Sequence, residues 1–587
     1  MLLMATSIRP AAPSLSYFSG RKASLVSKAK ACSMSKANST SPKAEPPLSH
    51  NSIPTNMNTH RRSGYYKPPT WPFEYIQSIN NDYVGKNYVK RFNELKEEIR
   101  KKLKIHDIDG AELDKLELID NLQRLGLSYH FKEEIFQILR SIHQQQILQQ
   151  EGRNVVSGEY SLLYATSLKF KLLREYGFDI SQETENTLKF ATKVTKSELK
   201  NYLENYEYSE ENVTTTLVRH ALELPSHWMM LRLETRWYLN VYEKMPNANP
   251  LLLELAKLDF NIVQATHQQE LKDVSRWWKN TCLAKKLPFS RDRLVECFFW
   301  AVGMVLFEPQ QGHCRVNLAK INALATTLDD IYDIYGTYHE LQLFTDAVER
   351  WDLKAMEQLP EYMKVMYLAM FNTINEIVYE VLKEQGINVL PYLIKPWTDL
   401  CKAYLREARW YYNGYKPTMQ EYMDNAWISV AMPMILTHTF FLVTNPITKE
   451  ELESLSKYPD IIRWSSTIVR FADDLGTSSD ELKRGDVPKS IQCYMNETGA
   501  SEEEAREHVQ YLIKETWEML NKAQTENLLF SGMFVEIAKN TARTAQCMYL
   551  HGDGHGIQNA ETKNSISKIL FEHITVPNPF MSPNSSP

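Results

Sequence analysis

The 587-residue chain has few cysteines, and none of them form a close pair. The seven cysteines are scattered, and no C-x-x-C spacing occurs. This pattern indicates a reducing compartment and argues against a disulfide framework or a structural zinc site. A strong charge of one sign is also missing, because the formal net charge is −5. This balance argues against a nucleic-acid partner.

Acidic residues are nearly absent from the N-terminal segment. Residues 1–60 are rich in Ser, Ala, Lys and Arg, and no acid precedes Glu45. The segment also lacks the continuous apolar stretch of a secretory signal. Its composition predicts a plastid transit peptide over 1–60, with a mitochondrial peptide and a disordered tail as the alternatives. Without this segment, 60 basic and 71 acidic residues leave a net charge of −11.

The rest of the chain lacks the alternation of apolar and polar residues that is typical of β-strands. Apolar residues instead recur at helical spacing, as Phe92, Leu95 and Ile99 illustrate. No internal repeat is found, and a chain of this length is too long for one ordinary core. We therefore predict an all-α protein with two helical domains, over 61–280 and 281–587, and we expect no membrane partner.

An acidic motif ends a helical run in the predicted second domain. The stretch from Leu324 reads L-A-T-T-L-D-D-I-Y-D, which contains Asp329, Asp330 and Asp333. Positions 329 and 333 are one helical turn apart and share a face. Carboxylates this close repel one another unless a hard cation such as Mg²⁺ bridges them to phosphate oxygens. Taken alone, the motif fits an acidic, solvated helix end equally well.

A second motif favours the metal site. Residues 473–481 read D-D-L-G-T-S-S-D-E, which places Asp473, Thr477 and Glu481 on one helical stripe. Two facing stripes of oxygen ligands can hold Mg²⁺ ions around a diphosphate. The predicted metal ligands are Asp329, Asp330, Asp333, Asp473, Thr477 and Glu481.

Together with a third motif, these stretches resemble a known family. The run R-R-S-G-Y-Y-K-P-P-T-W, from Arg61 to Trp71, is similar to the RR-x8-W signature of angiosperm monoterpene synthases. D-D-I-Y-D and D-D-L-G-T-S-S-D-E are similar to the two metal motifs of plant class I terpene synthases. The resemblance extends from Arg61 to about Pro577. It implies an N-terminal α-barrel-like domain and a C-terminal class I terpenoid synthase α-bundle.

The resemblance also implies a reaction and its ligands. Geranyl diphosphate would be ionised with three Mg²⁺ ions, with Mn²⁺ as a substitute, and the cation would cyclise. Arg291 and Arg293 match the family's diphosphate-binding R-x-R, and Lys489 lies in a loop that orders over the diphosphate. His555 and Tyr549 are candidates for proton handling. The predicted catalytic residues are Arg291, Arg293, Arg470 and Tyr549, and the predicted substrate-binding residues are Arg291, Asp329, Asp333, Arg470, Lys489, Trp300 and Asn322.

One polar residue bears on the product. Asn322 lies seven residues before Asp329, two turns along the same face, in an otherwise largely apolar stretch. A buried amide needs a hydrogen-bond partner, which is either a neighbouring backbone group or a water. A water beside the cation favours 1,8-cineole or α-terpineol as the product. Trp300 and Tyr549 are expected to line the cavity, where a ring face stabilises a cation by roughly 0.5–2 kcal/mol; core packing is the alternative for each.

Three other functions stay open. A sesquiterpene synthase would act on farnesyl diphosphate, a chain-elongating transferase would carry two D-D-x-x-D motifs, and a non-catalytic homologue would bind no Mg²⁺-dependent ligand. The first domain has no D-x-D-D, the motif expected where such a domain protonates a double bond. After Glu183 it also lacks part of one or two helices that the family usually has. We predict a shortened, structural first domain in a monomer of the plastid (chloroplast) stroma.

Overall fold

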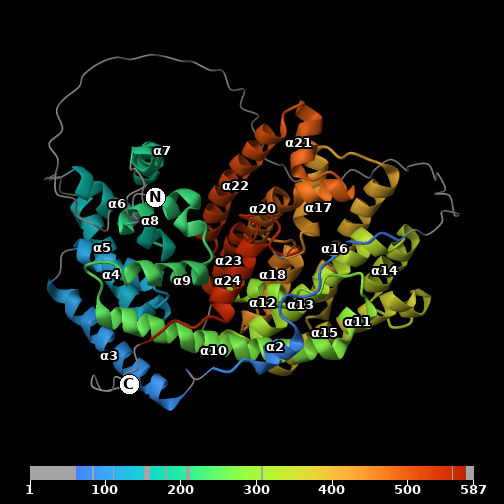
Figure 1. Cartoon of the computed structure of the whole chain (residues 1–587), viewed down its shortest axis with the longest axis horizontal. Helices are drawn as coiled ribbons and strands as arrows, with labels where there is room; N and C mark the ends of the chain where they lie inside the picture. Colours follow the sequence, from blue (N-terminus) through green and yellow to red (C-terminus); the bar gives the residue numbers. More distant parts are fainter. Residues whose placement is uncertain are drawn as a thin grey trace, which may run out of the picture. The chain divides into compact units, whose positions relative to one another are not determined.

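A computed structural model describes residues 61–576 apart from 82, 84, 110–111, 151–158, 179–181, 206–211, 306–307 and 558. The predicted transit peptide over 1–60 lies outside these residues. All described residues belong to one compact unit. They form helices, turns and extended segments, and none of them forms a β-strand (Figure 1). The predicted all-α fold is therefore confirmed.

The first helices follow an extended arm. Gly64 and three prolines keep residues 61–72 out of a helix, as the sequence predicts. Of the apolar stripe recognised in the sequence, Leu95 and Ile99 are buried. The helices of this part are α2 (Phe73–Ser78), α3 (Lys86–Asp109), α4 (Glu112–Arg124), α5 (Lys132–Gln150), α6 (Glu159–Glu175), α7 (Gln182–Asn205), α8 (Val213–Glu223), α9 (Leu231–Tyr242) and α10 (Pro250–Thr281).

The C-terminal half contains the helices that carry the predicted site. Helix α20 packs against α22 and α23, and α12 packs against α13. These helices are α11 (Leu283–Lys286), α12 (Leu294–Met304), α13 (Gly312–Asp330), α14 (Tyr338–Arg350), α15 (Glu361–Gln385), α16 (Leu390–Asn413), α17 (Met419–Ser429), α18 (Met432–Val443), α19 (Lys449–Leu455), α20 (Asp460–Arg484), α21 (Ser490–Thr498), α22 (Glu502–Thr525), α23 (Gly532–Met548) and α24 (Ala560–Leu570).

The 32-residue helix α10 joins the two halves. Its first turn is fixed by Pro250 and by the Asn249 side chain, which accepts hydrogen bonds from the backbone N–H groups of Leu251 and Leu252. Helix α10 contacts α3 and α9 of the first half and α12, α13 and α24 of the second (Figure 1). The predicted domain boundary at 280–281 falls at its C-terminal end, and these bounds remain a prediction, as does the shortening of the first domain.

The last described residues are tied to α10. The buried side chain of Asn261 donates to the carbonyl of Ile574 at 2.7 Å and accepts from its N–H at 2.9 Å. Gln268 donates to the carbonyl of Leu570 at 2.7 Å, and Gln264 holds two further carbonyls. Because buried amides need such partners, residues 569–574, here called the C-terminal strap, are fixed to a helix about 300 residues earlier.

One stretch has the length and apolar composition of a membrane-crossing helix, which our expectation from the sequence overlooked. This stretch, Met419–Val443, is mostly buried inside the fold, as the core of a soluble protein can be. It is also interrupted, because α17 ends at Ser429 and α18 begins at Met432. Ala431 between them has a φ of 66°, and Pro433 stands in the first turn of α18. We interpret the stretch as two core helices separated by a break.

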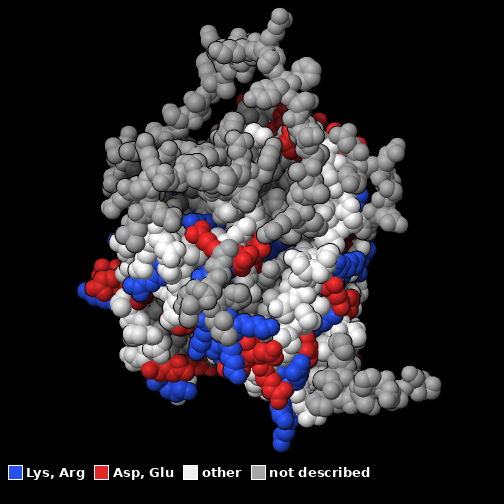
Figure 2. Space-filling view, turned by 90° about the vertical axis from the view of Figure 1, so that its left-hand side faces the viewer, with Lys and Arg blue, Asp and Glu red and all other residues white. Residues whose placement is uncertain are grey.

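The surface carries both signs of charge. On the face shown in Figure 2, basic and acidic side chains of the described residues lie beside one another. This mixture is what a modest net charge leads one to expect.

Candidate active site

A cavity among the C-terminal helices brings together most of the predicted site residues. Its walls come from α12, α13, α16, α20, the break between α17 and α18, the loop after α20, and the segment after α23. The predicted residues that line it are Arg291, Trp300, Asn322, Asp329, Asp333, Arg470, Asp473, Thr477, Glu481, Lys489, Tyr549 and His555.

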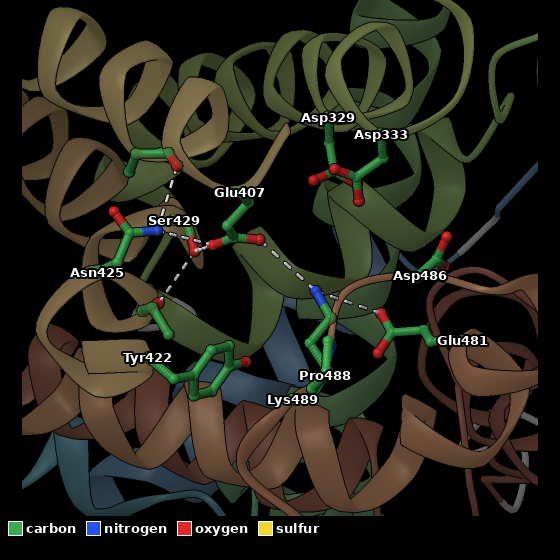
Figure 3. Close-up of polar contacts among 12 residues, drawn as sticks. Asp329, Asp333, Glu407, Tyr422, Asn425, Ser429, Glu481, Asp486, Pro488 and Lys489 are labelled. Atoms are coloured by element: carbon green, nitrogen blue, oxygen red, sulfur yellow. Dashed lines mark hydrogen bonds and ion pairs between the residues drawn. The ribbon is translucent and has the colours of Figure 1, made fainter. Parts of the chain in front are cut away.

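The first acidic motif lies where an α-helix changes to a wider turn. Helix α13 ends at Asp330, and residues Ile331–Tyr335 form a π-helical turn that is closed by a 2.8 Å hydrogen bond from Gly336 N to the Ile331 carbonyl. Asp329 and Asp333 both line the cavity, and Figure 3 shows their carboxylates pointing toward one another. Burial and the charge of Asp329 hold the pKa of Asp333 well above its usual range.

Asp330 does not line the cavity, in contrast to the sequence-based expectation of a metal ligand. Its buried carboxylate accepts a 2.6 Å hydrogen bond from the backbone N–H of Arg291 and a 3.2 Å bond from Arg291 Nε. The same guanidinium reaches Asp329 with Nη2. Burial raises the pKa of Asp330, although Arg291 opposes this effect. Asp330 therefore positions Arg291, and this placement does not favour direct metal ligation.

Arg293 is also placed away from the cavity lining. Its buried guanidinium donates to the carbonyl of Gly556 at 3.1 Å and to the carbonyl of Lys67 at 3.1 Å. These bonds join the N-terminal arm to the segment after α23. Because its donors are used in this way, the placement favours a structural role over the predicted contact with the diphosphate.

The second acidic motif repeats the arrangement of the first. Asp473 lines the cavity and pairs with Arg470. The next residue, Asp474, is buried and lies 2.7 Å from Arg470 Nη2. It also accepts hydrogen bonds from Tyr422 Oη and from the backbone N–H of Ser490, both at 3.0 Å. Asp474 thus braces the start of α21, whereas Asp473 faces the cavity.

The arm after Arg61 reaches both motifs. Arg62 Nη1 donates to the backbone carbonyl of Asp333 at 2.9 Å, and its Nη2 pairs with Asp486 in the loop after α20. Arg61 lies 2.8 Å from Glu340 and stacks over the ring of Tyr335 at 4.4 Å. Two arginines of the arm therefore connect the π-helical turn with the loop that carries Lys489.

Other residues of the cavity lining are aromatic or weakly polar. The rings of Trp300 and Tyr549 lie 6.2 Å apart between centroids. Asn322 donates to the carbonyl of Cys297 at 3.4 Å. The Thr326 hydroxyl and His555 Nε2 are 3.0 Å apart. Burial lowers the pKa of His555 to about 3, so its imidazole is neutral near pH 7.

The donor set fits divalent cations. Four carboxylates of the two acidic motifs and the Thr477 hydroxyl line one cavity, and oxygen donors of this kind are the ligands of Mg²⁺. Burial raises the pKa of Glu481, and its Oε2 has no hydrogen-bond partner among the described residues. Within the same residues, no three His, Cys, Asp or Glu side chains gather around one point. Arg291, Arg470 and Lys489 instead compensate the acidic charge.

Some cavity residues were not found from the sequence. Glu407 and Tyr404 on α16 line the cavity, as does Asp553 after α23. Glu407 lies between Arg406 and Arg409, and such a charged stretch predicts a solvent-exposed helix face, so the local sequence does not identify Glu407 as a cavity residue. The break around Ala431 does carry a signal, because Pro433 disfavours a continuous helix through that position.

Comparisons with known proteins agree with this geometry. Residues 279–519 match the family model described as terpene synthase family, metal binding domain, and residues 70–215 match the model described as terpene synthase, N-terminal domain. A chloroplastic (R)-linalool synthase of Solanum lycopersicum is 54% identical, covering 89% of this chain and 92% of the relative. A chloroplastic 1,8-cineol synthase of Nicotiana suaveolens is 53% identical, covering 98% and 97%.

Solved structures show the same two-domain helical architecture. A limonene synthase with 2-fluorolinalyl diphosphate superimposes with a TM-score of 0.82 at 42% identity, covering 88% of this chain and all of that chain. An isoprene synthase of Populus x canescens, in complex with three Mg²⁺ ions and dimethylallyl-S-thiolodiphosphate, gives 0.76 at 40% identity, covering 86% and 99%. The chain belongs to the terpene synthase family, in the branch of the plant class I monoterpene synthases.

Proposed function

We propose that the chain is a monoterpene synthase that ionises geranyl diphosphate and cyclises the resulting cation. The observation that carries the proposal is the mixed lining of one cavity. Two oxygen-bearing stripes and four cationic side chains line it together with the aromatic rings of Trp300 and Tyr549. This combination suits a substrate with an anionic diphosphate and a ten-carbon apolar chain.

The two acidic motifs would bind the cations, and the basic side chains beside them would bind the leaving group. Asp329, Asp333, Asp473, Thr477 and Glu481 would hold the divalent cations, which when bound supply Lewis-acid assistance to departure of the diphosphate. Three Mg²⁺ ions, replaceable by Mn²⁺, are part of the proposal, supported by the three ions in the isoprene synthase complex. The chain's own cations that would stabilise the developing charge on the diphosphate are Arg291, Arg470 and Lys489.

The aromatic residues of the lining would shape the carbocation. The ring faces of Trp300 and Tyr549 favour positive charge near them, each by roughly 0.5–2 kcal/mol. The arm carrying Arg61 and Arg62 would exclude bulk water, so that the cation reacts only with groups in the cavity. Neutral His555 and the released diphosphate are the groups that would accept the final proton.

An oxygenated product is favoured over a hydrocarbon. Asn322 lines the cavity, and the only hydrogen bond of its side chain to another described residue is the long one to the Cys297 carbonyl. Its side chain can therefore orient a water beside the cation. The relatives include the 1,8-cineol synthase reported above and a terpineol synthase of Nicotiana alata, which is 54% identical to this chain. We propose 1,8-cineole or α-terpineol as the main product class.

The place and state of the enzyme also belong to the proposal. Relatives at 53–54% identity are named chloroplastic, and residues 1–60 have the composition of a transit peptide. We infer a monomer of the plastid stroma that binds neither nucleic acid nor a membrane.

The test is incubation of the full chain with geranyl diphosphate and Mg²⁺, with the volatiles identified by chiral gas chromatography–mass spectrometry. Monoterpenes that disappear on chelation with EDTA are expected. Farnesyl diphosphate is supplied in parallel, because a larger turnover of that substrate would support the sesquiterpene alternative. A folded protein that makes no product from either substrate would refute the proposal and favour a non-catalytic homologue.

A further inference from the structure

Glu407 is a buried carboxylate in the cavity wall that belongs to neither acidic motif. It is 5% exposed and projects from α16. Its Oε1 accepts hydrogen bonds from the Ser429 hydroxyl and, at 3.0 Å, from Asn425 Nδ2. Asn425 also donates to the carbonyl of Ala403 at 3.1 Å, which fixes the amide. These bonds hold Oε1 against the end of α17, so that Oε2 is directed elsewhere (Figure 3).

The other oxygen of Glu407 faces Lys489. Glu407 Oε2 lies 3.7 Å from Lys489 Nζ, and Glu481 Oε1 lies 4.0 Å from the same nitrogen. Figure 3 shows the Lys489 ammonium between these two carboxylates, which come from α16 and α20. Lys489 and Glu407 each have side chains only 7% exposed. The ammonium therefore compensates two enclosed negative charges that would otherwise be costly.

The Lys489 ammonium is near both carboxylates but forms a hydrogen bond with neither. Both distances exceed the 2.7–3.2 Å of an N–H···O hydrogen bond, so the attraction is electrostatic and leaves the ammonium able to change partners. Lysine carries a compact charge on a flexible stem, which suits a group that changes partners. Lys489 also lies directly after the loop that follows Gly485, whose φ of 79° ends α20.

Resting on the function proposed above, we propose that Glu407 is a positioning residue for Lys489. With Glu481 it holds the ammonium as an internal counter-charge, and Lys489 moves to the diphosphate once Glu481 ligates a divalent cation. Glu407 and the diphosphate therefore compete for one lysine. Through this exchange, the Lys489 ammonium becomes available to the diphosphate only when divalent metal ions are bound to the acidic motifs.

A double-mutant cycle tests the exchange without turnover. The dissociation constant of inorganic diphosphate in excess Mg²⁺ is measured by calorimetry for the full chain and for E407Q, K489M and E407Q/K489M. Because E407Q removes the competitor for Lys489, we expect it to tighten diphosphate binding by roughly threefold to tenfold. In the K489M background the same change should have less than about half of this effect on the binding free energy, because only the loss of a nearby negative charge remains. Glu451→Gln, at a buried capping carboxylate of α19 outside the cavity, is the matched control and should change nothing.

Equal effects of E407Q in both backgrounds, or weaker binding in E407Q, would overturn the proposal. A second measurement uses the unaltered protein and so does not depend on folding of the variants. Acetylation of Lys489, followed by mass spectrometry, should accelerate severalfold when Mg²⁺ is added without diphosphate, because Glu481 then leaves the ammonium. Lys483, which is paired with Asp480 on the same helix, is the internal control. An unchanged rate at Lys489 would contradict the exchange.

The outcomes separate this inference from the proposed function. A chain that makes no monoterpene but shows the coupling between Glu407 and Lys489 retains the positioning role and loses the proposed reaction. A chain that makes monoterpenes and shows no coupling retains the reaction and loses the positioning role.

Discussion

Neighbouring aspartates in each acidic motif point in different directions. Asp329 and Asp473 line the cavity, whereas Asp330 and Asp474 are fully buried and hold Arg291 and the start of α21. A helix turns by about 100° per residue, so two adjacent side chains cannot share a face. The first residue of each D-D pair is therefore placed for binding and the second for support.

This division leads to opposite expectations for two conservative variants. Asp329→Asn should lower kcat/KM for geranyl diphosphate at least about 100-fold, while the unfolding temperature stays near that of the parent. Asp330→Asn should lower both kcat/KM and the unfolding temperature. It leaves Arg291 without its buried counter-charge, which should reduce the free energy of unfolding by on the order of 3 kcal/mol. Thermal unfolding and steady-state kinetics on the same samples check this, and equal stability of the two variants would contradict the assignment.

The product prediction concerns one amide. Asn322→Ile fills the same space with an apolar side chain that cannot hold a water. The alcohol and ether fraction of the products should fall at least severalfold in favour of cyclic hydrocarbons, with total turnover reduced less. Product ratios from gas chromatography decide the point, with Asn322→Gln as the conservative control. An unchanged oxygenated fraction in the isoleucine variant would rule out the water-positioning role.

At the residue scale, sequence reasoning succeeds where the partners are local. The spacing of Asp329 and Asp333, and of Asp473, Thr477 and Glu481, is enough to place each set on one face, because helix geometry fixes it. The same reasoning could not separate Asp330 from its neighbours, because its role depends on Arg291, 39 residues away. Likewise Glu407 on α16 acquires its partner Lys489, 82 residues farther along the chain, only through the tertiary fold.

At the scale of elements, the break between α17 and α18 shapes the cavity wall. Ala431 adopts a left-handed conformation that costs an L-residue roughly 1–2 kcal/mol. Ala431→Gly should therefore leave stability unchanged or raise it slightly, whereas Ala431→Val should lower it by about 1–2 kcal/mol because a β-branched residue fits this conformation poorly. Denaturant unfolding of the pair provides the comparison, and a valine variant as stable as the glycine variant would show that the break tolerates any side chain.

Helix α23 carries an acid-sensitive ion cluster. Glu536 lies 2.6 Å from Arg543 and 3.2 Å from Lys539. Burial alone would raise the pKa of Glu536, but the two cations outweigh it and lower the pKa to about 2, from an ordinary value of 4.5. A depressed carboxyl pKa stabilises the fold above pH 4.5, and this contribution is lost as the pH falls toward 2.

The expected consequence is a pH-dependent difference between two proteins. Glu536→Gln should unfold at a lower temperature than the parent near pH 7, and the gap should shrink steadily between pH 4.5 and 2. Calorimetry across this range measures the gap. A gap that stays constant down to pH 2 would mean that packing, and not charge, is what Glu536 contributes.

Elements were predicted better than their ends and interruptions. The apolar spacing of Leu95 and Ile99 was sufficient to predict a helix, because a helix on the surface of a core buries one apolar stripe. The π-helical turn at Ile331–Tyr335 has no such local signature. It depends on close packing of the residues around it. At Gly336, for example, an added Cβ would fall 2.5 Å from the Leu341 side chain.

At the scale of the whole molecule, the arm couples distant parts of the site. Arg62 connects the carbonyl of Asp333 with Asp486, 153 residues farther along the chain, as their residue numbers show. R61A/R62A should retain the fold but lower the cyclic share of the products severalfold, because the cavity closes less completely. Supplying linalyl diphosphate, in which the isomerisation has already occurred, should restore cyclic products. Failure of that substrate to do so would show that the arm serves something other than isomerisation.

The C-terminal strap makes the cavity wall depend on a distant docking step. The residues that bind Asn261 and Gln268 follow the segment with Tyr549 and His555, at and just after the end of α24. A chain whose strap is undocked would hold both acidic motifs but an unfinished cavity wall. Water would then reach any cation formed inside. We therefore expect competence for cyclisation to appear late in folding, after the strap has docked onto α10.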